Sequence, residues 1–173
     1  LETLTDESLP YVPIGTFPTA VQRFDRLAER LAVGDLYVKR DDRSGELYGG
    51  NKVRKLAYLL GDARRRGIDD VWTIGSLGSN HVLATSLYAR EHSFVPHAIQ
   101  YPEPVDEHVR DTLRVLSTTR PHLELHDSSD AAFAVGDRRE RRFHTLDDPD
   151  FYYVPPGGAT PVGELGFVNA ALE

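Results

Sequence analysis

A lysine that follows two glycines at the expected start of a helix is the first group in this sequence that could do covalent chemistry. Gly49, Gly50 and Asn51 precede Lys52, and apolar residues at helical spacing follow it. The positive end of a helix dipole disfavours an ammonium group and lowers the pKa of a lysine placed there. Such a lysine can act as a base or form a Schiff base. The alternative, a glycine turn followed by a solvated lysine, stays open on residue types alone.

Two further loops join an expected strand to an expected helix. Residues 75–81 (Gly-Ser-Leu-Gly-Ser-Asn-His) offer small residues, two hydroxyl groups and free backbone N–H groups, which suit a carboxylate or a phosphate. The alternative is ordinary helix capping by Ser79 or Asn80. Residues 155–161 (Pro-Pro-Gly-Gly-Ala-Thr-Pro) occupy the same kind of position, and their alternative is a rigid turn.

Metal and thiol chemistry find little support in the sequence. His122, Glu124 and His126 would share one face of a strand, but no fourth ligand is evident. A solvent-facing strand is the simpler interpretation, so we expect no metal. The absence of cysteine excludes disulfides, iron–sulfur clusters and a thiol nucleophile.

The composition indicates a globular, acidic protein. The 173 residues carry a formal net charge of −7, which argues against nucleic acid as the main ligand. No apolar run is long enough to cross a bilayer, and residues 1–30 lack the apolar stretch of a signal peptide. We therefore expect a soluble, cytoplasmic protein with no membrane partner. The chain has no Met and starts with Leu1, which suggests trimming or modified residues.

The apolar pattern alternates between helical and strand periods along the chain. After an extended arm over residues 1–18, we expect helices over 21–32, 53–67, 81–92 and 105–119, after Ser128–Ser129, and from Pro161. We expect strands over 36–38, 71–74, 95–101, 123–126 and 151–154. This order predicts an α/β fold with an open, mainly parallel sheet and helices on both faces. Ligands of such folds bind at the carboxyl ends of the strands, where the three loops lie.

Four segments together resemble a known enzyme family. They are residues 37–42 (Tyr-Val-Lys-Arg-Asp-Asp), 49–56 (Gly-Gly-Asn-Lys-Val-Arg-Lys-Leu), 79–81 (Ser-Asn-His) and 155–166. Their order and spacing are similar to those of the 1-aminocyclopropane-1-carboxylate deaminase / D-cysteine desulfhydrase family, and the second segment is the most specific. The resemblance runs from about Pro18 to Glu173. It implies a pyridoxal-phosphate enzyme of fold type II, the tryptophan-synthase-β-like fold.

The resemblance also implies roles for individual residues. Lys52 matches the lysine that holds the cofactor covalently and shuttles the substrate proton, and Ser79 lies near the reacting carbon; both are expected to be catalytic. Asn80 matches the residue that hydrogen-bonds the 3′ oxygen of the cofactor. The expected cofactor-binding residues are Lys52, Asn51, Asn80 and, near the phosphate, Lys55. The expected substrate-binding residues are Ser79, Asn80 and His81.

The chain departs from the family in two side chains and in length. Gly78 stands where the family usually has Gln, and Val82 where a small or hydroxylated residue is common. Family members are about twice as long, and their second half carries the phosphate loop. We therefore expect residues 1–54 and 156–173 to be parts of an incomplete large cofactor lobe. Residues 55–155 should form a small α/β lobe.

The activity implied by the resemblance is that of a deaminase or lyase acting on a small amino acid. D-cysteine would give pyruvate, ammonia and sulfide, and 1-aminocyclopropane-1-carboxylate would give 2-oxobutanoate and ammonia. We expect a homodimer of the full-length protein, and an inactive 173-residue chain on its own. The alternative is a truncated or split chain of the same fold that is catalytically silent or works through a partner. An unrelated α/β anion-binding module ranks third.

Overall fold

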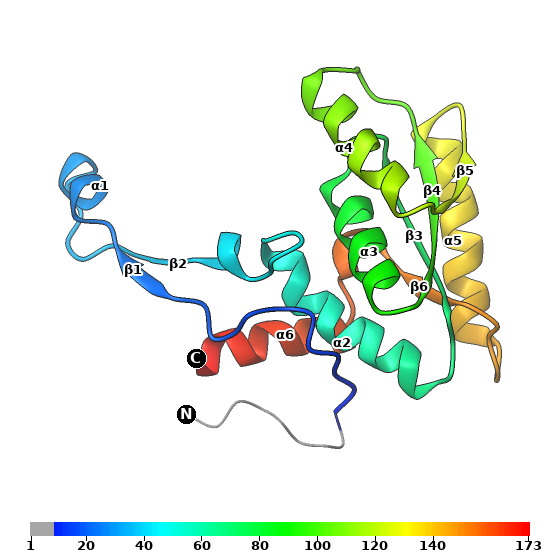
Figure 1. Cartoon of the computed structure of the whole chain (residues 1–173), viewed down its shortest axis with the longest axis horizontal. Coiled ribbons are helices and arrows are strands. Elements are labelled where there is room, and N and C mark those ends of the chain that lie inside the picture. Colours follow the sequence, from blue (N-terminus) through cyan, green and yellow to red (C-terminus); the bar gives the residue numbers. More distant parts are fainter. Residues whose placement is uncertain (1–8) are drawn as a thin grey trace.

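A four-stranded parallel sheet is the centre of the larger part of the molecule (Figure 1). The computed structural model describes residues 9–173, so the first part of the expected arm, residues 1–8, lies outside the described residues. The strand order is β5-β4-β3-β6, and every neighbouring pair is parallel. The strands are β3 (Asp70–Ser76), β4 (Val95–Tyr101), β5 (His122–Leu125) and β6 (Tyr152–Val154).

Helices cover both faces of this sheet, which confirms the predicted α/β fold. Helices α3 and α4 lie on one face and α5 on the other, while α2 and α6 pack together at one side (Figure 1). The helices are α2 (Asn51–Arg65), α3 (Asn80–Glu91), α4 (Glu107–Thr118), α5 (Ser129–Thr145) and α6 (Pro161–Leu172). Within residues 9–173, no helix has the length and apolar character needed to span a membrane.

Capping side chains fix where four of these helices begin. The side chains of Ser79, Asp106, Ser128 and Thr160 each accept a hydrogen bond from the backbone N–H three residues later. Such a bond satisfies one of the donors that the first helical turn leaves free. The predicted cap at Ser128 and the predicted start of the last helix at Pro161 are confirmed.

The predicted helix over residues 21–32 is wrong in its first part. Val21–Arg23 forms strand β1, which pairs antiparallel with β2 (Tyr37–Lys39); only Asp25–Arg30 forms a helix, α1. All three β1 residues are exposed and Ala28 is the buried residue of α1, so the apolar spacing here does not mark a buried helix face. The hairpin instead provides backbone hydrogen bonds for residues that have no core to pack on. It projects away from the sheet (Figure 1).

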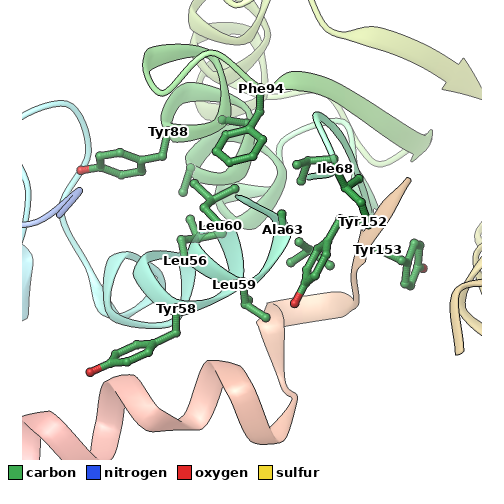
Figure 2. Packing of buried hydrophobic residues seen from close by; sticks show 14 of the residues in the cluster. Leu56, Tyr58, Leu59, Leu60, Ala63, Ile68, Tyr88, Phe94, Tyr152 and Tyr153 are labelled. Atoms are coloured by element: carbon green, nitrogen blue, oxygen red, sulfur yellow. The ribbon is translucent and has the colours of Figure 1, made fainter. Parts of the chain in front are cut away.

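Helix α2 has ten buried residues and carries much of the core. Figure 2 shows Leu60 and Ala63 on the side that faces Phe94 and Ile68, and Tyr58 on the side that faces α6. Helix α6 crosses α2 closely because Gly166 lies against α2: a Cβ there would come within 2.3 Å of a backbone oxygen. The start of α2, where Lys52 lies, is therefore anchored by packing on two sides.

A buried ion network joins four segments that are distant in sequence. The Arg54 side chain, 2% exposed, donates to the Asp41 carboxylate at 2.8 Å and to the Glu173 carboxylate at 2.8 and 3.0 Å. It also donates to the Thr19 hydroxyl at 2.9 Å, and Lys39 pairs with Glu173 at 2.6 Å. All of these residues, including Arg54 at the end of the first large-lobe segment, lie outside the proposed small lobe of residues 55–155. The division into two lobes stays a prediction.

Candidate active site

The three loops singled out in the sequence come together at the carboxyl ends of β3 and β6. The loop after β6 forms the short 3-10 helix η2 (Pro156–Gly158), which packs against α2 and β3. Lys52 Nζ lies 3.8 Å from the position that a Cβ would take on Gly157, whose φ of +69° favours glycine. The His81 ring interacts with the backbone of Pro155. Lys52, His81 and the Gly157 turn therefore share one site.

The Lys52 amine is the least neutralised of the three lysines in the chain. Lys52 Nζ donates a hydrogen bond to the side-chain amide oxygen of Asn51 at 3.3 Å. Lys39 and Lys55 instead pair with the carboxylates of Glu173 and Glu164, each at 2.6 Å. Burial, followed by the nearby charge of Lys55, lowers the pKa of Lys52, although Glu164 opposes the shift. A lysine in this setting keeps more of its amine in the unprotonated, nucleophilic form.

His81 is a buried, neutral imidazole beside Lys52. Its side chain contacts Thr73 through Nε2 and Oγ1 at 2.9 Å, and a backbone hydrogen bond with Pro155 partly opposes the lowering of its pKa. Burial, with a smaller contribution from Lys52, lowers the pKa of His81 to about 4. A buried, neutral imidazole near the Lys52 amine gives the site a polar group without adding a positive charge.

We expect His81 to make the protein less stable in mild acid. Below a pH of about 6.5 the unfolded chain binds a proton at His81, whereas the folded protein does so only near pH 4. The stabilisation from neutral His81 is thus complete above pH 6.5 and is lost as the pH falls to 4, by up to about 3 kcal/mol. Urea unfolding at pH 7 and pH 4.5 measures this loss. His81→Asn should reduce it and His108→Asn, at an exposed position, should not; an equal loss in both variants would contradict the assignment.

The start of α3 can receive an anion. Ser79 Oγ accepts from Val82 N at 3.3 Å, so the capping interpretation of Ser79 holds in the structure. The backbone N–H groups of Asn80 and His81 have no acceptor among the described residues. Free N–H groups at the positive end of a helix favour a carboxylate or a phosphate. Capping by Ser79 and anion binding are therefore compatible at this loop.

The side chains of the other predicted site residues face different partners. Asn51 is exposed at the start of α2. Asn80 Oδ1 accepts from the hydroxyl of Tyr48 at 2.7 Å. Lys55 Nζ is bound to Glu164 at 2.6 Å, so a phosphate would have to compete with that carboxylate. The phosphate role of Lys55 stays a prediction.

Gly78 has a packing reason to differ from the glutamine that the resemblance leads one to expect. Its N–H donates to the carboxylate of Glu103. A Cβ on Gly78 would lie 2.7 Å from that carboxylate and 2.8 Å from a methyl group of Val109. A longer side chain at this position would require Glu103 to move. In this chain, the hydrogen bond between Gly78 N–H and the Glu103 carboxylate holds the loop before α3.

His122 in β5 and His126, which follows this strand, contact other side chains. Glu124 accepts from Arg139 at 2.8 Å and contacts His126 at 3.1 Å. The ring of His122 stacks on His97 at 4.6 Å between centroids. Across residues 9–173, no group of three or more metal-ligating side chains is placed to hold an ion.

Sequence reasoning missed Tyr48 and Thr73 as neighbours of the site. Thr73 lies inside the predicted buried strand. Its contact with His81 can be recognised only when the position of the following helix over that strand is known. Tyr48 directly precedes Gly49 and Gly50, so its position beside the most specific motif could have marked it.

Comparisons with known proteins identify a matching family and several relatives. The family profile described as "Pyridoxal-phosphate dependent enzyme" matches residues 12–173. The chain is 36% identical over 176 residues to the nocardicin C-9′ epimerase of Nocardia uniformis subsp. tsuyamanensis, covering 96% of this chain and 50% of that protein. It is 33% identical over 165 residues to the D-cysteine desulfhydrase of Serratia proteamaculans, covering 90% and 48%.

A solved structure described as that of "the ACC deaminase homologue" superposes with a TM-score of 0.77 at 33% identity, covering 95% of this chain and 50% of that one. This similarity confirms the predicted fold type II. The chain spans about half the length of the curated relatives that it matches.

Proposed function

The chain belongs to the family of pyridoxal-phosphate-dependent enzymes, and we propose that it supplies the lysine side of the active site of a deaminase or lyase that acts on a small amino acid. The observation that carries this proposal is the Lys52 amine. Its pKa is lowered, it has no carboxylate partner within residues 9–173, and it lies beside the Gly157 turn.

The residues of the site fit the cofactor of the family. Lys52 is placed for covalent attachment, the neutral imidazole of His81 lies near it, and the Asn80 NH₂ group can donate to the 3′ oxygen carried by the cofactor ring. When bound, pyridoxal phosphate serves as an electron sink for the substrate carbon. Lys52 Nζ, once free, takes up and returns the substrate proton. The free N–H groups of Asn80 and His81 bind the substrate carboxylate, and Ser79 lies next to them.

Two substrates remain candidates for deamination, D-cysteine and 1-aminocyclopropane-1-carboxylate. Similarity to a D-cysteine desulfhydrase and to an ACC deaminase homologue supports both. The products would be ammonia and a 2-oxo acid, with sulfide from D-cysteine.

A second candidate reaction is epimerisation of an amino acid. The 36% identity to nocardicin C-9′ epimerase favours it. Epimerisation shares the removal of a carbon-bound proton, but the proton returns to the opposite face and no ammonia leaves. Assays for ammonia and 2-oxo acid, run beside chiral chromatography of the recovered amino acid, separate the two reactions.

We also propose that residues 1–54 and 156–173 contribute to a larger lobe and that the functional protein is a cytoplasmic homodimer. The Arg54 network supports the first point, because it joins Thr19, Asp41 and Glu173. The alternative of a catalytically silent chain that acts with a partner predicts the same fold without turnover. Light scattering and cell fractionation test the dimer and the location.

The 173-residue chain alone should bind pyridoxal phosphate weakly, with a dissociation constant of roughly 0.1–1 mM. The resemblance implies that the phosphate loop lies in the half of the family that this chain does not span. Absorbance titrations of the wild type and of Lys52→Ala with pyridoxal phosphate, compared with each other, measure the part of the binding that depends on Lys52. Visible absorbance that is identical in the two proteins would contradict the proposed function. Tight, stoichiometric binding that depends on Lys52 would instead show that a phosphate site exists within these residues.

A further inference from the structure

Tyr48 and Asn80 form a direct link between the two motifs that line the site. Tyr48 comes from the turn before α2, and Asn80 is the first residue of α3. The Tyr48 hydroxyl donates to Asn80 Oδ1 at 2.7 Å. No role follows for Tyr48 from the family motif, which begins at the next residue, Gly49.

Hydrogen bonds with Tyr88 hold the backbone of Tyr48 in place. The Tyr88 hydroxyl donates to the backbone oxygen of Tyr48 at 2.7 Å, and the backbone N–H of Tyr48 points back to the same hydroxyl at 3.4 Å. Tyr88 is a buried residue of α3. The Tyr48 ring packs against both hydrophobic clusters of the molecule. These contacts fix the position of the Tyr48 hydroxyl next to Asn80.

The hydrogen bond determines which end of the Asn80 amide is available to a ligand. An asparagine amide carries an oxygen that accepts and an NH₂ group that donates. With Oδ1 engaged by Tyr48, the NH₂ group is the end left for a ligand. The start of α3 adds the positive end of its dipole and the free N–H of His81. All of these groups favour a ligand oxygen that carries negative charge.

We propose that Tyr48 is a positioning residue that orients the Asn80 amide so that its NH₂ group donates to the 3′ oxygen of pyridoxal phosphate. The identity of this ligand rests on the proposed function, whereas the orientation of Asn80 does not. The hydroxyl of Tyr48 contacts the side chain of Asn80, so Tyr48 would act through Asn80.

The orientation is tested without cofactor by NMR of the ¹⁵N-labelled chain. Asn80→Ser identifies the side-chain amide signals of Asn80 by their loss. These signals should be separate and sharp in the wild type, and they should shift in Tyr48→Phe more than in the matched control Tyr37→Phe, which removes an exposed hydroxyl. Unchanged Asn80 signals in a folded Tyr48→Phe would overturn the proposal. If that variant does not fold, a wild-type Asn80 amide as mobile as that of exposed Asn51 would overturn it.

The ligand is tested by titration with two probes, pyridoxal 5′-phosphate and its 3-deoxy analogue. Loss of the Tyr48 hydroxyl should weaken binding of pyridoxal phosphate about three- to tenfold, the usual effect of one hydrogen bond. The analogue lacks the oxygen, so its binding should change less than about twofold. Equal weakening for both probes would overturn the assigned ligand. Absence of lysine-dependent binding by the wild type would count against the proposed function, while the NMR result would still decide the role of Tyr48.

Discussion

Lys52→Ala should abolish covalent labelling of this chain by pyridoxal phosphate and borohydride, whereas Lys39→Ala and Lys55→Ala should retain it. The reason is the state of the three amines. Lys39 and Lys55 are bound to carboxylates at 2.6 Å, while Lys52 contacts an amide oxygen at 3.3 Å and has a lowered pKa. An unprotonated amine is the form that attacks a carbonyl carbon.

The measurement is reduction with borohydride at neutral pH, followed by peptide mapping by mass spectrometry. The labelled fraction of each lysine is compared in the wild type and in the three variants. In the wild type the label should lie on Lys52. Equal labelling of Lys39 or Lys55 would remove the basis for assigning Lys52 as the attachment site.

Arg54→Met should lower the free energy of unfolding by about 3–5 kcal/mol, the usual cost of removing one partner of a buried ion pair. The variant leaves the carboxylates of Asp41 and Glu173 near each other, with Lys39 as the remaining cation. The exposed pair between Arg114 and Asp111 provides the control. Arg114→Ala should change the free energy of unfolding by less than about 1 kcal/mol.

Urea unfolding measures both variants, and its pH dependence identifies the cause. Burial alone would raise the pKa of Glu173, but hydrogen bonds from Arg54 and Lys39 outweigh it and lower the pKa to about 2. A lowered carboxyl pKa adds stability above the unfolded value of about 4.3, and this stability is lost as the pH falls toward 2. The loss between pH 5 and pH 2.5 should be smaller in Arg54→Met. A destabilisation that is the same at both pH values would point to lost packing instead.

The order of strands and helices could be predicted because each element carries its own local signal. Val95–Tyr101 is a mostly apolar segment of strand length, and Ser128 and Pro161 are residues that commonly start helices. The error at residues 21–32 has the same origin. Periodicity reports a spacing of apolar residues, but it does not report whether a core exists for them to face.

For the candidate site, too, local features could be predicted from the sequence and contacts between distant residues could not. The loops that contain Lys52 and Ser79 could be found because they combine motif residues with a strand-to-helix position. The pairing of Tyr48 with Asn80 could not, because it joins the turn before α2 to the first residue of α3, and the two meet only after α3 packs beside α2. The partners of Arg54 were missed for the same reason, since Glu173 and Asp41 reach it from the ends of separate segments. Interactions between distant residues leave no spacing in the sequence to detect.

The position of β6 next to β3 has a consequence for how the chain is made. β3 gains β4 as its neighbour soon after it leaves the ribosome, but β6 follows only after α4, β5 and α5. At a synthesis rate of about 5–20 residues per second, the other edge of β3 stays unpaired for several seconds. An unpaired apolar strand can join another chain. The edge of β3 at Val71–Thr73 is therefore open to pairing with another chain during that interval.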